Sequence, residues 1–439
     1  MPQKLSRICL VRLTLFALLG LFALYMQGCS VFKSASGGQD RISSQGAAGQ
    51  IELNRFDLAR DVDVIGQLHA VRIAEGDTLA DIARHFSLGV NALSAANPGV
   101  DVWVPEQGRR IILPLGFVLP DAPRKGIVVN LASMRLFQYG DQNGQMQVMT
   151  YPVGIGTIER PTPRGSTRVL RKAFRPTWHV PASIAADHRK KGDPLPGKIP
   201  PGPDNPLGEY ALYLGKSGYL IHGTNKLASI GLQATNGCLR LYPENIAQLY
   251  KDTPVNTPVM IVNQPYLVGK RNGVIYLEAH APLEDTDKRT AGRFEERLKR
   301  IERSTARKLD WGQVRGIQRE ARGIPVPILD MNQPGVPTEE NITELEHPAV
   351  LSGKPLPPEW RDDAWYVLAA VVSEEKDARR MAAIINHQGP AIPARVMPKK
   401  GGYRVVAGPF DDGDKARTVA RRLKIDLNLT GVVFDTAGR

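Results

Sequence analysis

The sequence predicts a multidomain protein in which a small α/β unit and a mostly-β domain precede an α+β unit. Its 439 residues exceed the length of one ordinary domain, which favours two to four folded units. Short runs of strand-forming residues, separated by turn signals, fill residues 124–263. A strand–turn–helix pattern occurs twice in residues 363–437. The composition, with 42% hydrophobic residues, is globular, and 34 prolines indicate stiff linkers between units.

The first 29 residues have the pattern of an export signal. Three basic residues precede fourteen uncharged residues, LTLFALLGLFALYM, and QGCS follows. This apolar run is short for a membrane-spanning helix, which needs about 20 residues. Cys29 resembles the lipidated cysteine of bacterial lipoproteins, and Ser30 after it implies an outer-membrane anchor facing the periplasm. An uncleaved inner-membrane anchor is the alternative.

Residues 30–67 follow as a predicted flexible tether, because their first part is rich in Ser, Gly, Gln and Ala. The formal charge of +13 favours an anionic partner. Nucleic acid is the first class of partner that such a charge indicates, but an exported protein would not meet nucleic acid.

The cysteines have distinct expected roles. Cys9 lies in the signal and Cys29 is the lipidation site, which leaves Cys238 as the free thiol of the mature chain in an oxidising compartment. A lone thiol in such a compartment is either a small buried apolar residue or a reactive nucleophile.

Residues 68–115 predict the small α/β unit. A strand, AVRI, leads into the turn EGD, and Thr78 can cap a helix that begins at LADIARHF. A second helical pattern, VNALSAAN, ends at Pro98, and the strand RRIILP closes the unit. The motifs GDTL, IA, NP and the closing LP resemble the LysM module. The resemblance implies binding to the N-acetylglucosamine-containing glycan of peptidoglycan, although a fold that has lost glycan binding is the alternative.

Residues 124–263 predict the mostly-β domain, with a sandwich or barrel-like sheet. The strand patterns are GIVVNLASMRLFQYG, QMQVMTYPVGIG, STRVLRKAF, YALYLGKSGYLIHG and PVMIVN. DQNGQ is a hairpin signal, and PENIAQLYK is the one clear helical pattern.

A cysteine and a histidine in this domain have the pattern of a thiol nucleophile and its base. His222 ends the predicted strand LIHG, so a rigid element can hold it in a cleft. Gly237 lets the backbone turn sharply before Cys238, whose thiol attacks only as thiolate. Backbone N–H groups near Gly237 and Cys238 can face an oxyanion. Arg240 follows Cys238 at a two-residue period and can hold a carboxylate or fix the loop.

The stretch IHGTNKLASIGLQATNGCLR, together with the upstream PVGIG and TPRG, resembles the L,D-transpeptidase catalytic domain over about 140 residues. The resemblance implies that Cys238 and His222 are catalytic. It implies oxyanion or substrate contacts for six further residues, namely Gly223, Thr224, Ser229, Asn236, Gly237 and Arg240. Asn236 stands where many members have a second histidine, so His222 is the sole candidate base.

The implied reaction is acyl transfer in cell wall biogenesis, with no cofactor and no metal. Cys238 attacks the diaminopimelate carbonyl of a tetrapeptide stem, D-Ala leaves, and an amine takes the acyl group. The amine belongs to another stem, giving a 3–3 cross-link, or to an envelope lipoprotein, whereas water would make the enzyme an L,D-carboxypeptidase. A non-catalytic peptidoglycan-binding scaffold is the other alternative. His179 and His188 lie in an expected substrate-facing loop and do not form a metal site.

Residues 264–323 predict a hairpin extension at RNG and a basic helix. Residues 288–322 hold twelve Lys or Arg against five Asp or Glu, and their apolar residues recur at helical spacing. A solvated helical face is the preferred interpretation, and contact with anionic wall polymer or a membrane surface is the alternative. Residues 324–360 are predicted to be a Pro-rich linker.

Residues 363–437 predict an α+β unit. VVAGPFDDGDKA resembles the signature of the SPOR domain, which implies a four-stranded antiparallel sheet backed by two helices. Their expected apolar faces are Ala378, Met381, Ala382 and Ile385 in one helix, and Ala416, Val419, Ala420 and Leu423 in the other. The resemblance also implies binding to glycan strands stripped of stem peptides, with a generic interaction module as the alternative.

Overall fold

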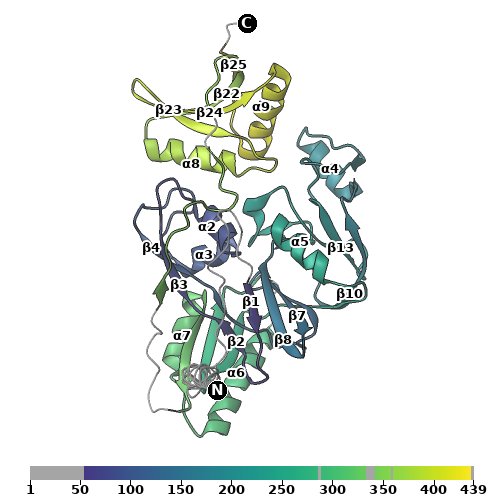
Figure 1. The fold of residues 1–439 in the computed structure, drawn as a ribbon, viewed down its shortest axis with the longest axis vertical. Helices are drawn as coiled ribbons and strands as arrows, with labels where there is room; N and C mark the ends of the chain where they lie inside the picture. The colour runs from purple at the N-terminus through teal and green to yellow at the C-terminus, as the bar shows by residue number, and fades with distance from the viewer. Residues whose placement is uncertain (1–53, 285–287, 333–341, 357–358, 437–439) are drawn as a thin grey trace, which may run out of the picture. The chain divides into compact units, whose positions relative to one another are not determined.

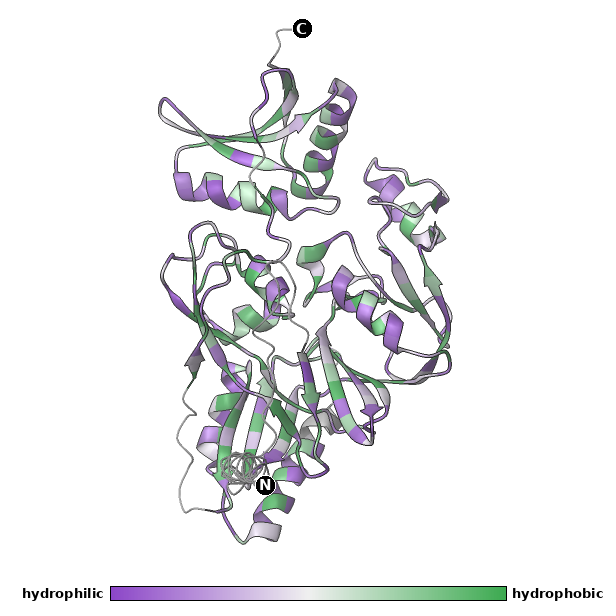
Figure 2. Ribbon diagram, in the orientation of Figure 1, coloured by the Kyte–Doolittle hydropathy of each residue, from purple (hydrophilic) through white to green (hydrophobic). Residues whose placement is uncertain are grey.

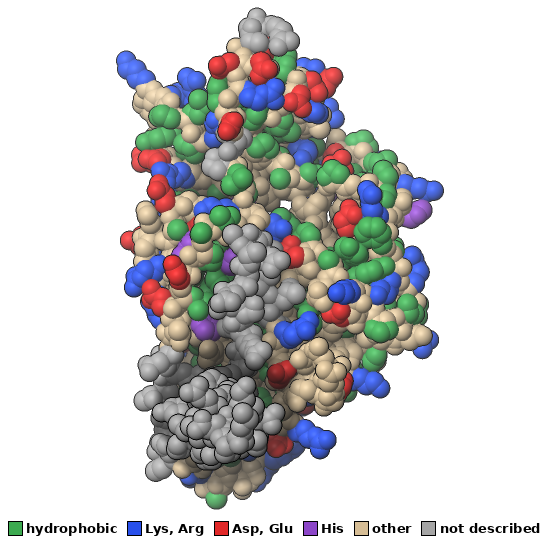
Figure 3. Space-filling model, in the orientation of Figure 1, with side chains coloured by type: hydrophobic (Ala, Val, Ile, Leu, Met, Phe, Trp, Pro, Cys, Tyr) green, Lys and Arg blue, Asp and Glu red, His purple; other side chains and the backbone are tan. Residues whose placement is uncertain are grey.

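The computed structural model describes residues 54–284, 288–332, 342–356 and 359–436 (Figure 1). The predicted signal, the lipidation site Cys29 and the first part of the predicted tether lie outside the described residues. Among the helices that are described, none has both the length and the apolar character needed to cross a membrane. On the face drawn in Figure 3, Lys and Arg side chains alternate with Asp and Glu rather than gathering in one patch.

A nine-stranded mixed sheet forms the centre of the mostly-β domain, which confirms the predicted fold class there. All neighbouring strands pair antiparallel except β6 with β17 and β14 with β16. In sheet order the strands are β1 (Asn54–Asp57), β8 (Gln145–Pro152), β7 (Arg135–Gln142), β6 (Gly126–Asn130), β17 (Pro258–Val262), β10 (Gly165–Phe174), β13 (Tyr210–Leu214), β14 (Leu220–His222) and β16 (Leu239–Arg240). The predicted turn between β7 and β8 is confirmed, because Asn143 and Gly144 both have positive φ.

The two faces of this sheet belong to two hydrophobic clusters. On one face, Ile127, Val129 and Leu136 pack with residues of β14 and of the helix α5 (Pro243–Asp252). On the other face, Val128 and Phe137 pack with residues of the small α/β unit. Strands β6 and β7 are therefore covered on both sides, which explains their continuous apolar runs.

The predicted tether over residues 30–67 is wrong at its end. Residues of β1 pair with β8, and β2 (Val64–Gly66) pairs with β5 (Gly116–Val118). Phe56 and Ile65 are buried in the cluster that the small unit shares with the large sheet. Burial of these apolar side chains stabilises the end of the segment, although its first part is polar.

The small unit has the predicted strand–helix–helix–strand order. It consists of β3 (His69–Arg72), α2 (Leu79–His85), α3 (Val90–Ala96) and β4 (Arg110–Leu113), with β3 and β4 antiparallel. Thr78 caps α2 as predicted, since its hydroxyl accepts from the N–H of Asp81 and the Asp81 carboxylate accepts from the N–H of Thr78.

Several contacts fix the small unit to the large sheet. Both terminal nitrogens of Arg135 on β7 donate to the carbonyl oxygen of Ser87, at 3.3 and 3.1 Å. Arg84 forms an ion pair with Glu244 at 3.1 Å, with both side chains largely buried. Glycine permits the closest approach, because a Cβ on Gly231 would lie 2.6 Å from the Cα of Gly89. The two units are therefore joined by a common hydrophobic core and not only by the chain that links them.

Residues 264–330 form a three-stranded antiparallel sheet covered by two helices. The strands are β18 (Tyr266–Arg271), β19 (Val274–His280) and β20 (Arg322–Asp330), and the helices are α6 (Lys288–Thr305) and α7 (Trp311–Glu320). The predicted hairpin at RNG is confirmed, with positive φ at Asn272 and Gly273. The predicted basic segment is helical, and Phe294 and Leu298 of α6 are buried against the sheet. That apolar face cannot also enter a lipid surface.

The predicted linker over residues 324–360 is wrong in two places. The first residues of the predicted linker belong to strand β20. A later part, β21 (Thr343–Glu344), pairs parallel with β3 of the small unit. Further along, Leu351 is buried and Lys354 forms an ion pair with Asp77 at 2.7 Å. This part of the chain is an ordered strap across the small unit.

The C-terminal unit is a four-stranded antiparallel sheet with two helices, as predicted. Its elements are β22 (Trp365–Val372), α8 (Glu375–Asn386), β23 (Ala394–Lys399), β24 (Gly402–Phe410), α9 (Gly413–Leu427) and β25 (Val432–Asp435), with sheet order β23-β24-β22-β25. The predicted helix faces are confirmed, since their residues are buried in or packed against this unit's own core. Figure 2 shows hydrophobic and hydrophilic residues alternating along both helices.

Candidate active site

Strands β14 and β16 bring the three central site residues to one face of the sheet. They pair parallel, with Ile221 beside Leu239 and His222 beside Arg240. Ile221 and Leu239 point into the buried core. Because side chains alternate along a strand, His222, Cys238 and Arg240 share the opposite face.

His222 is a buried neutral imidazole. Its side chain is 4% exposed, and Nδ1 lies 2.6 Å from the carbonyl oxygen of Gly223. A carbonyl only accepts, so Nδ1 carries the proton and Nε2 keeps its lone pair. Burial, and then the positive charge of Arg240, lower the pKa of His222 to about 3, against the opposing carbonyls of Gly223 and Leu207. His222 is therefore a free base throughout the neutral range.

The Cys238 thiol is partly buried and protonated at rest. Its Sγ donates to the carbonyl oxygen of Gly218 at 3.7 Å. Burial raises the pKa of Cys238, and a backbone contact to Leu220 and the charge of Arg240 only partly oppose this. The thiol and the imidazole are thus both neutral at rest, so a thiolate forms only when the thiol gives up its proton.

Gly237 makes the turn that presents the thiol. Its φ is +97°, and a Cβ there would lie 2.6 Å from Cε1 of Tyr219. Its N–H already donates to the hydroxyl of Thr235 at 3.1 Å, and that hydroxyl donates to the carbonyl of Cys238 at 2.6 Å. The expectation that the Gly237 N–H faces an oxyanion is therefore wrong for this conformation, which leaves the Cys238 N–H and the Asn236 amide as candidates.

Arg240 and Ser229 hold the loop beside the histidine. The Arg240 Nη1 donates to Ser229 Oγ at 3.3 Å and to the Ala234 carbonyl at 3.4 Å. Ser229 ends the short 3₁₀ helix η1 (Leu227–Ser229) and donates to the Lys226 carbonyl at 2.5 Å. Of the two roles expected for Arg240, the structure shows loop fixation.

Gly223 and Thr224 shape the backbone after His222. The Thr224 hydroxyl is buried and accepts from the Lys226 N–H at 2.9 Å. A Cβ on Gly223 would lie 3.2 Å from Ile246 of α5, so a small residue lets the helix approach. Both residues therefore shape the backbone turn that follows His222.

Arg160 is a site residue that sequence reasoning missed. It follows the short strand β9 (Ile155–Gly156), which pairs parallel with β15 (Gln233–Thr235). This pairing brings Arg160 to the exposed Asn236, whose Oδ1 accepts from Nη1 at 2.5 Å. Its Nη2 is ion-paired with Asp187. The motifs PVGIG and TPRG flank Arg160 in the sequence and were the available signal.

The expected substrate-facing loop contains unpredicted structure. It holds β11 (Trp178–His179), α4 (Ala182–Lys190) and β12 (Lys198–Ile199), with β11 and β12 antiparallel. His188 contacts Asp193 at 3.0 Å, and His179 is exposed. Across the described residues, no group of three or more His, Cys, Asp or Glu side chains is arranged to hold a metal ion.

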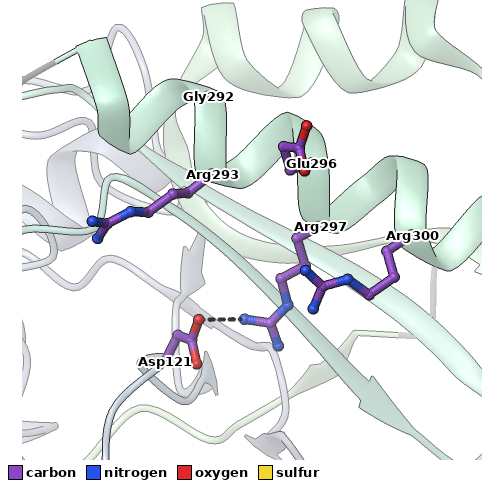
Figure 4. A pocket seen from close by; sticks show the side chains of 6 residues that line it. All are labelled: Asp121, Gly292, Arg293, Glu296, Arg297 and Arg300. Atoms are coloured by element: carbon purple, nitrogen blue, oxygen red, sulfur yellow. Dashed lines mark ion pairs between the residues drawn. The ribbon is translucent and has the colours of Figure 1, made fainter.

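A hollow lies on the basic helix α6, and no Cys or His side chain lines it. It has a volume of about 710 Å³ and is lined by three arginines of α6 together with Asp121. Figure 4 shows Arg293, Arg297 and Arg300 projecting from the helix, with Arg297 directed at Asp121, 3.4 Å away. Its side chains are largely exposed and its chemistry is separate from that of Cys238.

Comparisons with protein families identify two domains in this chain. The family of L,D-transpeptidase catalytic domains matches residues 124–261, and the SPOR domain family matches residues 362–434. The first match contains every residue of the site described above, from Arg160 to Arg240.

Relatives with the same family description match about half of the chain. The probable L,D-transpeptidase YbiS of Escherichia coli K12 is 40% identical over 233 residues, which are 52% of this chain and 75% of that protein. The probable L,D-transpeptidase ErfK/SrfK of the same organism is 40% identical over 224 residues, 50% of this chain and 71% of that protein. Among solved structures, the catalytic domain of an E. faecium L,D-transpeptidase is 18% identical, covers 32% of this chain and 99% of that one, and has a TM-score of 0.25.

Proposed function

Because the chain belongs to the L,D-transpeptidase family, we propose that Cys238 is the nucleophile and His222 the base of its peptidoglycan acyl transfer. The observation that supports this assignment is the shared face of β14 and β16, on which both residues lie beside Arg240. The Nδ1 proton of His222 is committed to the Gly223 carbonyl, so Nε2 is the atom that takes the thiol proton.

In the first half-reaction, the Cys238 proton moves to His222 as the sulfur attacks the L-centre carbonyl of diaminopimelate in a tetrapeptide stem. The tetrahedral oxyanion is held by the Cys238 N–H and the Asn236 amide. When the C–N bond breaks, the proton on His222 passes to the nitrogen of the leaving D-Ala, and a thioester remains on Cys238.

In the second half-reaction, an amine attacks the thioester and Cys238 leaves as thiolate. His222 takes a proton from the amine and returns it to the sulfur, so the resting pair is restored. An amine from a second stem gives a 3–3 cross-link, and the terminal lysine of an envelope lipoprotein gives attachment. Hydrolysis by water would instead make the protein an L,D-carboxypeptidase.

Incubation with a disaccharide-tetrapeptide tests these assignments. The full chain should release D-Ala and form a thioester adduct on Cys238 that mass spectrometry locates. Cys238→Ser should form no adduct, because an alcohol beside one neutral histidine is far less ionised than a thiol. A variant Cys238→Ser that still releases D-Ala would reject the nucleophile. Failure of the unmodified protein to release D-Ala would favour the non-catalytic scaffold.

The flanking units point to an enzyme held at its polymeric substrate. The SPOR domain is proposed to bind glycan strands stripped of stem peptides, and residues 68–115 are proposed to be a LysM module that binds peptidoglycan glycan. Lipidation of Cys29 would anchor the chain at the outer membrane, facing the periplasm. If Cys29→Ala still partitions unchanged into the outer-membrane fraction, the lipid anchor is rejected.

A further inference from the structure

Arg160 joins the nucleophile loop to the α4 arm, which is defined here as residues 175–205. Loop 157–164, which carries it, is fixed to the site, since the Thr157 N–H donates to the Thr235 carbonyl at 3.0 Å. From there one guanidinium nitrogen donates to Asn236, two residues before Cys238, and another is paired with Asp187 of α4. The Arg160 side chain is 34% exposed, so solvent and ligands can reach it.

The α4 arm is held firmly at its base and weakly at its tip. At the base, the amide of the buried Asn205 donates to the Pro176 carbonyl at 2.8 Å and to the Pro200 carbonyl at 3.2 Å. At the tip, helix α4 has no buried residue. An ion pair as exposed as Arg160–Asp187 stabilises little. The arm can therefore release Arg160 at small cost while its base stays in place.

The charge of the arm favours an anionic ligand once this pair opens. Asp187 is the single acidic residue of α4, and His188, Arg189 and Lys190 follow it in the last turn. Replacing the Asp187 carboxylate by a carboxylate of the ligand keeps Arg160 paired, and Arg189 and Lys190 still outweigh the negative charge of Asp187 on α4. Arg240 is less available for this role than Arg160, because its Nη1 already donates to Ser229 and Ala234 and its side chain is half-buried.

We propose that Arg160 is a specificity-determining residue, which exchanges Asp187 for a carboxylate of the donor stem beside the scissile bond. This inference rests on the proposed function. Two carboxylates of a tetrapeptide stem flank that bond, one on the diaminopimelate side chain and one on the terminal D-Ala. A guanidinium is suited to either, because its planar fork donates two parallel hydrogen bonds to a carboxylate.

Arg160 also orients Asn236, and the experiment must separate the two effects. Its Nη1 contacts Oδ1 of Asn236, which directs the amide nitrogen of Asn236 away from the guanidinium. Loss of this contact would affect the proposed oxyanion donor and would lower kcat for every stem alike. Loss of a carboxylate partner would raise KM, and only for stems that carry that carboxylate.

The test measures kcat and KM for D-Ala release on three disaccharide-tetrapeptides. One has free carboxylates, one has its diaminopimelate side chain amidated, and one ends in D-alaninamide. The unmodified protein should show a KM about 10- to 100-fold higher for one of the two amides, the range expected for a lost hydrogen bond to a charged group. Arg160→Gln should show that higher KM on the free stem and no discrimination against that amide. Arg160→Lys should recover part of the lost affinity for the free stem, because lysine keeps the positive charge but lacks the planar fork of two donors.

Two control variants sharpen the result. Asp187→Asn removes the resting partner of Arg160 and should lower KM for the free stem or leave it unchanged. Lys270→Gln removes one positive charge at an exposed position of β18, which belongs to another sheet, and should resemble the unmodified protein. Thermal unfolding of each variant checks that the domain remains folded.

Three outcomes would overturn the inference. Equal KM for all three stems in the unmodified protein would show that no carboxylate is recognised. A uniform loss of kcat in Arg160→Gln, with KM unchanged, would show that Arg160 only positions Asn236. No D-Ala release from any stem by the unmodified protein would reject the proposed function and this inference with it.

Discussion

Gly237→Ala tests whether the turn before the nucleophile sets its position. The backbone there has φ +97°, where an L-residue costs about 1–2 kcal/mol. The new Cβ would lie 2.6 Å from Cε1 of Tyr219, so reaching an ordinary 3.4 Å contact requires a shift of 3.4 − 2.6 = 0.8 Å. Overpacking of this kind costs about 1–3 kcal/mol, so we expect a total destabilisation of about 2–5 kcal/mol.

A shift of this size at the turn displaces the thiol as well. Misplacement of a reacting group by about 1 Å can slow catalysis by about 100-fold, so acylation of Cys238 by a tetrapeptide should fall by that order. Denaturant unfolding gives the stability change, and the rate of adduct formation, followed by mass spectrometry, gives the catalytic one.

Gly144→Ala is the matched control. Gly144 has φ +80° in the β7–β8 hairpin, and a Cβ there meets no atom within 4 Å. Its substitution should therefore cost only the backbone part, about 1–2 kcal/mol, and leave acylation unchanged. In the double variant Gly237→Ala with Tyr219→Ala, the ring is gone and the two stability changes should be less than additive. Gly237→Ala with unchanged acylation, or fully additive changes in the double variant, would refute the reasoning.

Three further predictions concern pH and domain organisation. The acylation rate should show no fall near pH 6.5, because burial lowers the pKa of His222 to about 3; a decline centred near 6.5 would contradict this. Between about pH 3 and 6.5 the unfolded chain binds more protons at His222 than the folded one, so stability should fall on acidification through that window, and less steeply in His222→Gln. Deleting residues 363–439 should leave turnover of soluble tetrapeptide nearly unchanged but reduce enrichment of a fluorescent fusion at midcell; equal enrichment would reject septal targeting by the SPOR domain.

The central part of the site could be predicted because its residues are close in the chain. His222, Cys238 and Arg240 lie within nineteen residues, and their alternation along two strands places them on one face. Arg160 could not be found in this way. It meets Asn236 across 76 residues, and only the pairing of β9 with β15 brings them together.

Other elements were missed because their local signals are weak or contradictory. Helix α4 buries no residue, so it has no apolar face that would produce a helical pattern. Strand β20 contains Pro325 and Pro327, which favour a linker in a sequence. Proline is tolerated there because β20 is an edge strand of its sheet, paired on one side with β19.

The attachment of the small unit bears on how the glycan binding proposed for residues 68–115 would serve catalysis. A module on a flexible tether raises the local concentration of substrate but leaves its orientation free. Here the small unit shares a hydrophobic cluster with the large sheet, and Gly89 touches Gly231 in the loop that follows Ser229. Ser229 in turn accepts from Arg240, which lies beside His222. A glycan strand held by this unit would therefore meet the thiol in a fixed orientation, so its binding energy can position the stem as well as concentrate it.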